Sequence, residues 1–164
     1  MPITLTVEDG TRPTGANTYA SLADANAYWA DRGNATWTDA TDDEKSEALI
    51  KATAYINGLS WATGTPVGDD MAWPRSGAVA PSGGCFSMSM VPKAVVNATC
   101  YMAGEILAGN DPLAMQDRPA LEINAGAVGV KFDPNAPIAP QFPAVRSILR
   151  GFLSASNTFK LLQA

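Results

Sequence analysis

The stretch MAWPRSG, residues 71–77, sets a large aromatic ring, a proline and a guanidinium side by side. Trp73 could stack on a nucleotide base while Arg75 contacts a phosphate, a combination that holds single-stranded nucleic acid in many proteins. The same residues could instead contact a partner protein, or wedge one helix against another. Three further tryptophans in the chain could add stacking planes, although most tryptophans in a chain of this kind lie in the core.

The residue types give little support for catalysis, metal binding or a phosphate-binding loop. The chain has no histidine, which removes the commonest general base and the commonest metal ligand. Cys85 and Cys100 are too few for a zinc site and have no CxxC spacing, although one disulfide between them is possible. No GxxxxGK[ST] or GxGxxG phosphate-binding motif occurs. We therefore expect no enzymatic activity, no metal and no cofactor.

Charge is sparse and unevenly distributed. Only 16% of the residues are charged, the net charge is −5, and the pI is near 4.5. Residues 1–60 hold nine acids and four bases, whereas residues 134–164 hold three bases and no acid. An acidic chain is poorly suited to general phosphate binding. Its polarity suits head-to-tail assembly, although scattered solvated charge would also explain the front half.

Three helices are predicted from periodicity and end signals. The first starts at Ser21, with Asp24 three residues on, and stops at Gly33. The second starts at Thr41, has Glu44 at its third position, and ends near Gly58. The third, from residue 92 to about 109, is apolar around most of its circumference and should be the centre of a bundle. Its polar stripe consists of Lys93, Asn97, Tyr101 and Glu105.

A long uncharged loop precedes the third helix. Residues 76–92 carry no charged side chain, so they form either a flexible tip or part of an interface. We favour an interface with a neighbouring subunit or another protein. The side chains available for such a contact are Phe86, Met88 and Met90.

Two β-segments are expected. The opening ITLTV, residues 3–7, alternates β-branched residues and predicts a short strand. Alternating apolar residues on either side of NAGA predict a β-hairpin near 120–133, too small to be stable alone. The hairpin side chains offered to neighbouring subunits would be Val128, Val130 and Phe132.

The C-terminal part predicts an arm that carries a helix. Prolines fall at every third residue from 134 to 143, the period of a polyproline II segment, so ten residues would span roughly 30 Å. The following AVRSILRGFL predicts a short amphipathic helix held away from the body and docking on another chain, although arginines late in a helix also simply complement its dipole. The candidate docking residues are Arg146, Ile148, Leu149, Arg150, Phe152, Phe159 and Lys160.

Together these elements predict a mainly α protein, a small bundle of about four helices with a short β-hairpin and an extended Pro-rich C-terminal arm ending in a helix. We expect a helical domain over residues 1–133 and an arm over 134–164. The N-terminus lacks the pattern of a signal peptide and no long apolar run occurs, so synthesis in the cytosol and no membrane contact are expected.

Four separate segments carry a family resemblance. They are VEDGTRPTGANTYASLADANAYWADRGNATW, EALIKATAYING, AWPRSG and VPKAVVNATCYMAGEIL, which cover about residues 7–109 in order. They resemble a family of tailed bacteriophages and prophages whose members are commonly labelled DnaT-like single-stranded-DNA-binding proteins, and whose place in phage assembly resembles that of head–tail adaptor proteins. The insert SGAVAPSGGCFSMSM is longer than the usual connection in that family.

The resemblance implies a structural virion protein at the neck of the particle. It would form a ring, twelvefold in expectation, under the portal protein, contact neighbouring adaptor subunits and a tail-side neck or tail-terminator protein, and let genomic DNA pass without sequence-specific binding. Trp73 would then pack into the bundle, and Arg75 would make an ion pair or carbonyl contacts. The alternative is a single-stranded-DNA-binding protein of phage replication or packaging that uses Trp73 and Arg75.

Overall fold

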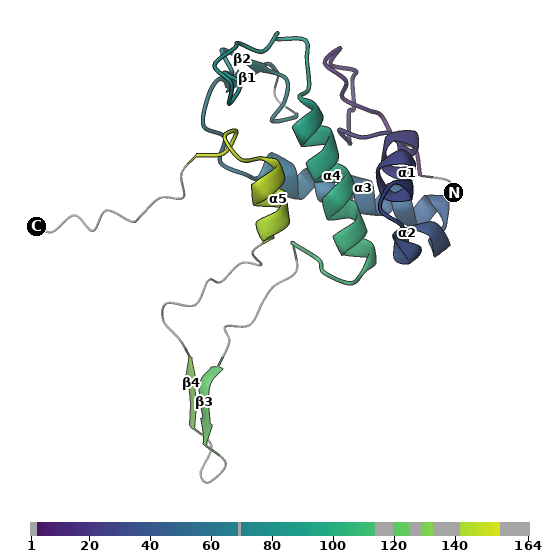
Figure 1. The fold of residues 1–164 in the computed structure, drawn as a ribbon, viewed down its shortest axis with the longest axis vertical. Coiled ribbons are helices and arrows are strands. Elements are labelled where there is room, and N and C mark those ends of the chain that lie inside the picture. The colour runs from purple at the N-terminus through teal and green to yellow at the C-terminus, as the bar shows by residue number, and fades with distance from the viewer. Residues whose placement is uncertain (1–2, 69, 114–119, 125–128, 133–141, 155–164) are drawn as a thin grey trace, which may run out of the picture.

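The helix Lys93–Leu107 (α4) lies at the centre of the fold, and four other helices contact it (Figure 1). The computed structural model describes residues 3–68, 70–113, 120–124, 129–132 and 142–154. The helices around α4 are Leu22–Ala30 (α1), Ala35–Asp39 (α2), Asp42–Asn57 (α3) and Pro143–Ile148 (α5). The expected mainly helical architecture with a short hairpin is therefore confirmed, with five helices in the described part of the chain.

The central place of α4 follows from its composition. Its fully buried residues include Val95, Ala98, Met102 and Ala103. The most extensive contact between helices is the one between α4 and α3, which crosses behind α4 in Figure 1. A helix that is apolar around most of its circumference must bury most of its surface, because exposed apolar area is unfavourable in water. The predicted core role of this helix is confirmed.

Local capping sets the starts of α1 and α3. The Ser21 hydroxyl accepts the Asp24 N–H at 3.0 Å, and the Asp24 carboxylate accepts the Ser21 N–H at 3.0 Å. Thr41 and Glu44 make the same reciprocal pair at the start of α3. Hydrogen bonds from Thr41 lower the pKa of Glu44 below its ordinary value. Both predicted capping boxes are confirmed, and α3 ends at the predicted Gly58.

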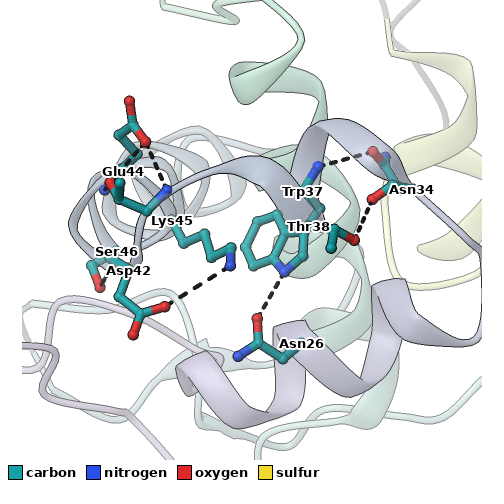
Figure 2. A network of polar contacts seen from close by, with 9 residues as sticks. Asn26, Asn34, Trp37, Thr38, Asp42, Glu44, Lys45 and Ser46 are labelled. Carbon is teal, nitrogen blue, oxygen red and sulfur yellow. Dashed lines mark hydrogen bonds and ion pairs between the residues drawn. The ribbon is translucent and has the colours of Figure 1, made fainter.

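The short helix α2 was not predicted. Asn34 caps it, with its side-chain oxygen accepting the Trp37 N–H at 3.1 Å. The Trp37 indole is buried, and its Nε1–H donates to Oδ1 of Asn26 at 2.8 Å, which ties α2 to α1 (Figure 2). A helix of five residues is too short to show a periodic pattern in the sequence. It depends on this tertiary contact with α1.

A lysine is buried beside this contact. Lys45 lies on α3 and is 8% exposed. Its ammonium points between the Asp42 carboxylate, at 3.9 Å, and the Trp37 ring, whose centroid is 5.9 Å away (Figure 2). Its aliphatic stem covers apolar surface while the charge keeps a partner. The acidic residues at the start of this helix, Asp42, Asp43 and Glu44, are exposed.

Two small antiparallel pairs complete the described elements. Thr65–Pro66 (β1) pairs with Arg75–Ser76 (β2), and Ala120–Asn124 (β3) pairs with Gly129–Phe132 (β4). The second pair confirms the predicted hairpin. The predicted strand at residues 3–7 is wrong, because only Val7 forms a bridge, with Thr18. The N-terminal segment instead uses Asn17, whose side-chain oxygen accepts the Thr6 N–H at 2.8 Å.

The helix α5 does not stand away from the body. Val145 and Leu149 are 0% exposed, and α5 packs against α4. The prediction of a helix held outward is wrong, since its apolar face completes the core of its own chain. Residues 134–141 of the Pro-rich segment that precedes α5 lie outside the described residues. Cys85 is an exposed free thiol and Cys100 a buried one, so they do not form the disulfide that the sequence allowed.

Candidate functional site

The Trp73 side chain lies in the core and is 2% exposed. Its ring meets those of Trp61, Phe86 and Phe152 edge to face, at centroid distances of 5.5, 5.7 and 6.2 Å. These four residues form what we call the aromatic cluster. Because its ring is enclosed by this cluster, Trp73 offers no face to a base, and its expected packing into the bundle is confirmed.

The Arg75 side chain is equally occupied. Nε donates to the Thr63 carbonyl at 2.9 Å, Nη1 to the Ala72 carbonyl at 3.1 Å, and Nη2 to the Gly64 carbonyl. The residue is 8% exposed, and burial lowers its pKa. The guanidinium therefore fixes the loop through carbonyl contacts, one of the two roles expected for it, and does not face solvent as a phosphate ligand would.

A second set of bonds holds the same loop. The Trp73 N–H donates to the Tyr19 hydroxyl at 2.9 Å, and the Ala72 N–H donates to Oδ1 of Asn57 at 3.1 Å. The Tyr19 hydroxyl also bonds to Asn57 Oδ1, and burial raises the pKa of Tyr19. Backbone and guanidinium are thus both committed to structure, so the MAWPRSG stretch is a scaffold.

The predicted docking residues of α5 are split between core and surface. Leu149 is buried, Ile148 is half-buried, and Phe152 stacks on Phe86 at 5.7 Å. Arg146 and Arg150 are exposed. Phe159 and Lys160 lie outside the described residues. The apolar half of this set consequently contributes to the core of its own chain.

The remaining candidates lie on the uncharged loop and the hairpin. Phe86 belongs to the aromatic cluster, while Met88 and Met90 are 58% and 48% exposed. Val130 and Phe132 lie in β4, and Val128 lies outside the described residues. Of the three candidates on this loop, Met88 and Met90 are therefore the two exposed side chains.

A groove between α1 and α4 brings aromatic and cationic side chains together. It has a volume of about 310 Å³. We call it the α1–α4 groove; its lining residues are Asp24, Ala27, Tyr28, Asp31, Arg32, Lys93, Val96, Asn97 and Cys100. The two helices lie side by side in Figure 1, although about sixty residues of chain separate them.

The Arg32 guanidinium lies over the Tyr28 ring. Its central carbon is 3.7 Å from the ring centroid, and Nη1 donates to the Tyr28 carbonyl at 2.7 Å. Tyr28 lies in the last turn of α1, and Arg32 follows four residues later in the turn after the helix ends at Ala30. Burial raises the pKa of the Tyr28 hydroxyl, with Arg32 opposing the shift, so the ring remains neutral at physiological pH. This geometry is a cation–π pair facing the groove.

The second cation comes from the start of α4. Lys93 is exposed, and Asn97 follows one turn later on the same face. Asp24 and Asp31 also line the groove, yet in the described part of the chain no carboxylate lies within 4.0 Å of Arg32 or Lys93. Both cations are therefore free to take an external anion. Burial raises the pKa of the Cys100 thiol to about 12, so that group stays protonated and is no nucleophile.

A smaller cavity, of about 160 Å³, lies beside the MAWPRSG loop. Its buried carboxylate, Glu8, already accepts the N–H groups of Gly10 at 2.8 Å and of Arg12 at 3.1 Å. Both bonds go to Oε1 of Glu8 and order the loop at residues 8–12. Within the described ranges, no group of three or more metal-ligating side chains gathers, and no helix is long and apolar enough to cross a membrane.

Comparison with protein families gives one match. The model of the family described as "Putative DnaT-like ssDNA binding protein" matches residues 3–163. The chain belongs to this family. Neither the curated proteins nor the solved structures gave a match.

Membership of this family corrects the main functional expectation. The match spans nearly the whole chain and gives nothing that points to a head–tail adaptor, so the inferences of a portal-bound ring, of adaptor, portal and tail partners, and of a passive DNA channel are wrong. The physical arguments for them fail as well, because the helix expected to reach a portal packs on its own domain. The location in a virion neck and the absence of enzymatic activity stay predictions.

The α1–α4 groove was not predicted from the sequence. Lys93 and Asn97 were recognised only as the polar stripe of their helix, and neither Tyr28 nor Arg32 was singled out. The signal that could have found them is the spacing in YWADR, an aromatic residue followed four positions later by an arginine. The pairing of the two helices, however, is a tertiary fact.

Proposed function

We propose that this chain binds single-stranded DNA in the α1–α4 groove. The observation that carries the proposal is the Arg32 guanidinium on the Tyr28 ring, with the unpaired ammonium of Lys93 in the same groove. The description of the family gives the ligand class. A cation for the backbone beside a flat surface for the bases is the usual arrangement for single strands.

Different residues of the α1–α4 groove contact different parts of the DNA strand. Lys93 and Arg32 contact phosphates, and their attraction is undiminished by ion pairs with described carboxylates. The carboxamide of Asn97, which lines the same groove, presents a donor and an acceptor to base edges. Trp73 and Arg75, the residues first considered for this role, act as scaffold.

The acidity of the protein shapes the expected affinity. With a net charge of −5 and carboxylates at Asp24 and Asp31, the surface repels the dense charge of a duplex. A single strand carries less charge per length and can place one or two phosphates on the cations without bringing the others near acids. We therefore expect modest, salt-sensitive binding with a preference for single strands.

The test is fluorescence anisotropy of a labelled oligothymidine of about 15 nucleotides, a length within the range of single-strand sites. The double variant Arg32→Ala/Lys93→Ala should bind on the order of tenfold more weakly at low salt. Its slope of log K against log salt should fall by about 1.4, because each phosphate contact on a single strand contributes about 0.7.

The matched control is Arg146→Ala/Arg150→Ala, which removes the same charge from two exposed residues, one in α5 and one in the turn that follows it. It should keep most of the affinity and the full salt slope. Equal losses in the two double variants would mean that only net charge matters and would contradict the site. Tighter binding of duplex than of single strand by the unaltered protein would contradict the function.

A further inference from the structure

We infer that Arg32 is the stacking plane of the site, with an unpaired base lying on the guanidinium and the guanidinium lying on Tyr28. This inference rests on the proposed function and names the residue that recognises bases. It differs from the usual arrangement, in which the aromatic ring itself receives the base. The consequence is a three-layer stack of tyrosine, arginine and base.

The position of the guanidinium carries the argument. At 3.7 Å from the centroid, it covers the face of the Tyr28 ring that a base would need. The hydrogen bond from Nη1 to the Tyr28 carbonyl, at 2.7 Å, holds it there. One guanidinium face is covered by the ring, and the other belongs to an exposed residue that lines the groove. Guanidinium planes stack on nucleobases as aromatic rings do.

The support beneath the stack is rigid. The Tyr28 ring meets the Trp29 indole edge to face, with centroids 5.2 Å apart. Trp29 is buried, and its Nε1–H donates to the Cys100 carbonyl of α4 at 3.0 Å. Both helices thus fix the layer below Arg32. A platform ordered before binding loses little conformational entropy when the ligand arrives.

This arrangement selects for unpaired bases. A base inside a duplex has both faces covered by its neighbours, so only a strand whose bases can separate offers a free face. The charge of Arg32 and its plane are distinct contributions, because a lysine would supply the first and lack the second. The substitution Arg32→Lys therefore separates base stacking from phosphate attraction.

The experiment compares two oligonucleotides of equal length and charge, an oligothymidine and one with abasic sites in place of its central bases. The unaltered protein should prefer the oligothymidine by roughly 5- to 150-fold, the range expected for one stacked base. Arg32→Lys should bind both equally while keeping the salt slope. Arg150→Lys, the same change on an exposed residue of another surface, should keep the preference.

The outcomes distinguish failure of the proposed function from failure of this inference. If the unaltered protein binds neither oligonucleotide, the proposed function and this inference both fall. If it binds both equally, or if Arg32→Lys keeps the preference, the function stands and the stacking role of Arg32 is wrong. A second measurement needs no variant: the Arg32 Hε resonance should move upfield when oligothymidine is added and stay in place with the abasic strand.

Discussion

Gly104 of α4 lies directly against the indole of Trp29 from α1. A Cβ at position 104 would overlap Cζ2 of the ring and lie 2.6 Å from Cε2. Glycine is therefore required here by the close approach of a buried side chain, since the ring is held in place by the hydrogen bond from Nε1 to the Cys100 carbonyl, one turn earlier on the same helix. This contact sets the spacing of the two helices that form the groove.

The substitution Gly104→Ala should accordingly destabilise the protein. Forcing a methyl group into a packed contact costs typically about 1–3 kcal/mol of unfolding free energy. Urea denaturation followed by tryptophan fluorescence measures this loss. Gly58→Ala is the matched control, because Gly58 has a φ of −74° and only ordinary contacts, the nearest at 3.5 Å. An unchanged midpoint for Gly104→Ala would contradict the close approach.

Arg75→Ala tests whether the guanidinium is a scaffold. The change leaves the carbonyls of Thr63, Gly64 and Ala72 without their partner, so we expect a loss on the order of 3 kcal/mol in unfolding free energy. Under conditions where the variant is folded, its affinity for oligothymidine should match that of the unaltered protein. A folded variant with normal stability and lost binding would restore Arg75 as a nucleic-acid contact.

Leu149→Ala tests the place of α5. Since the side chain is 0% exposed, its truncation should cost about 2–5 kcal/mol of unfolding free energy. The neighbouring change Arg150→Ala, on the exposed face, should cost less than about 0.5 kcal/mol. Chemical denaturation of both variants gives the comparison. Similar, small effects would show that α5 contributes nothing to the core.

Thr41→Ala removes the hydroxyl cap of α3 and should cost about 1 kcal/mol at neutral pH. Because hydrogen bonds from Thr41 lower the pKa of Glu44 below its ordinary 4.5, the Glu44 carboxylate stabilises the fold above that value and loses this effect as pH falls through the lowered pKa. The difference between variant and unaltered protein should therefore shrink as the pH falls from 4.5 through the lowered pKa of Glu44. Denaturation at several pH values checks this, with Thr36→Ala on α2 as the control.

The sequence by itself determined the local starts and ends of the helices. Ser21 with Asp24, and Thr41 with Glu44, were found because a capping box acts over three residues and needs no other part of the chain. The β3–β4 hairpin was found for the same reason, since alternation and a turn lie close together in sequence. The apolar residues around most of the circumference of α4 likewise predicted that this helix is buried.

Only the tertiary structure decided which surfaces remain open. Trp73 and Leu149 could have been exposed or buried on pattern alone, and both are enclosed by residues far away in sequence. The α1–α4 groove depends on Gly104 admitting the Trp29 ring, which aligns Arg32 with Lys93. Such side chains converge because distant apolar faces pack, and that packing is a property of the whole chain rather than of any one segment.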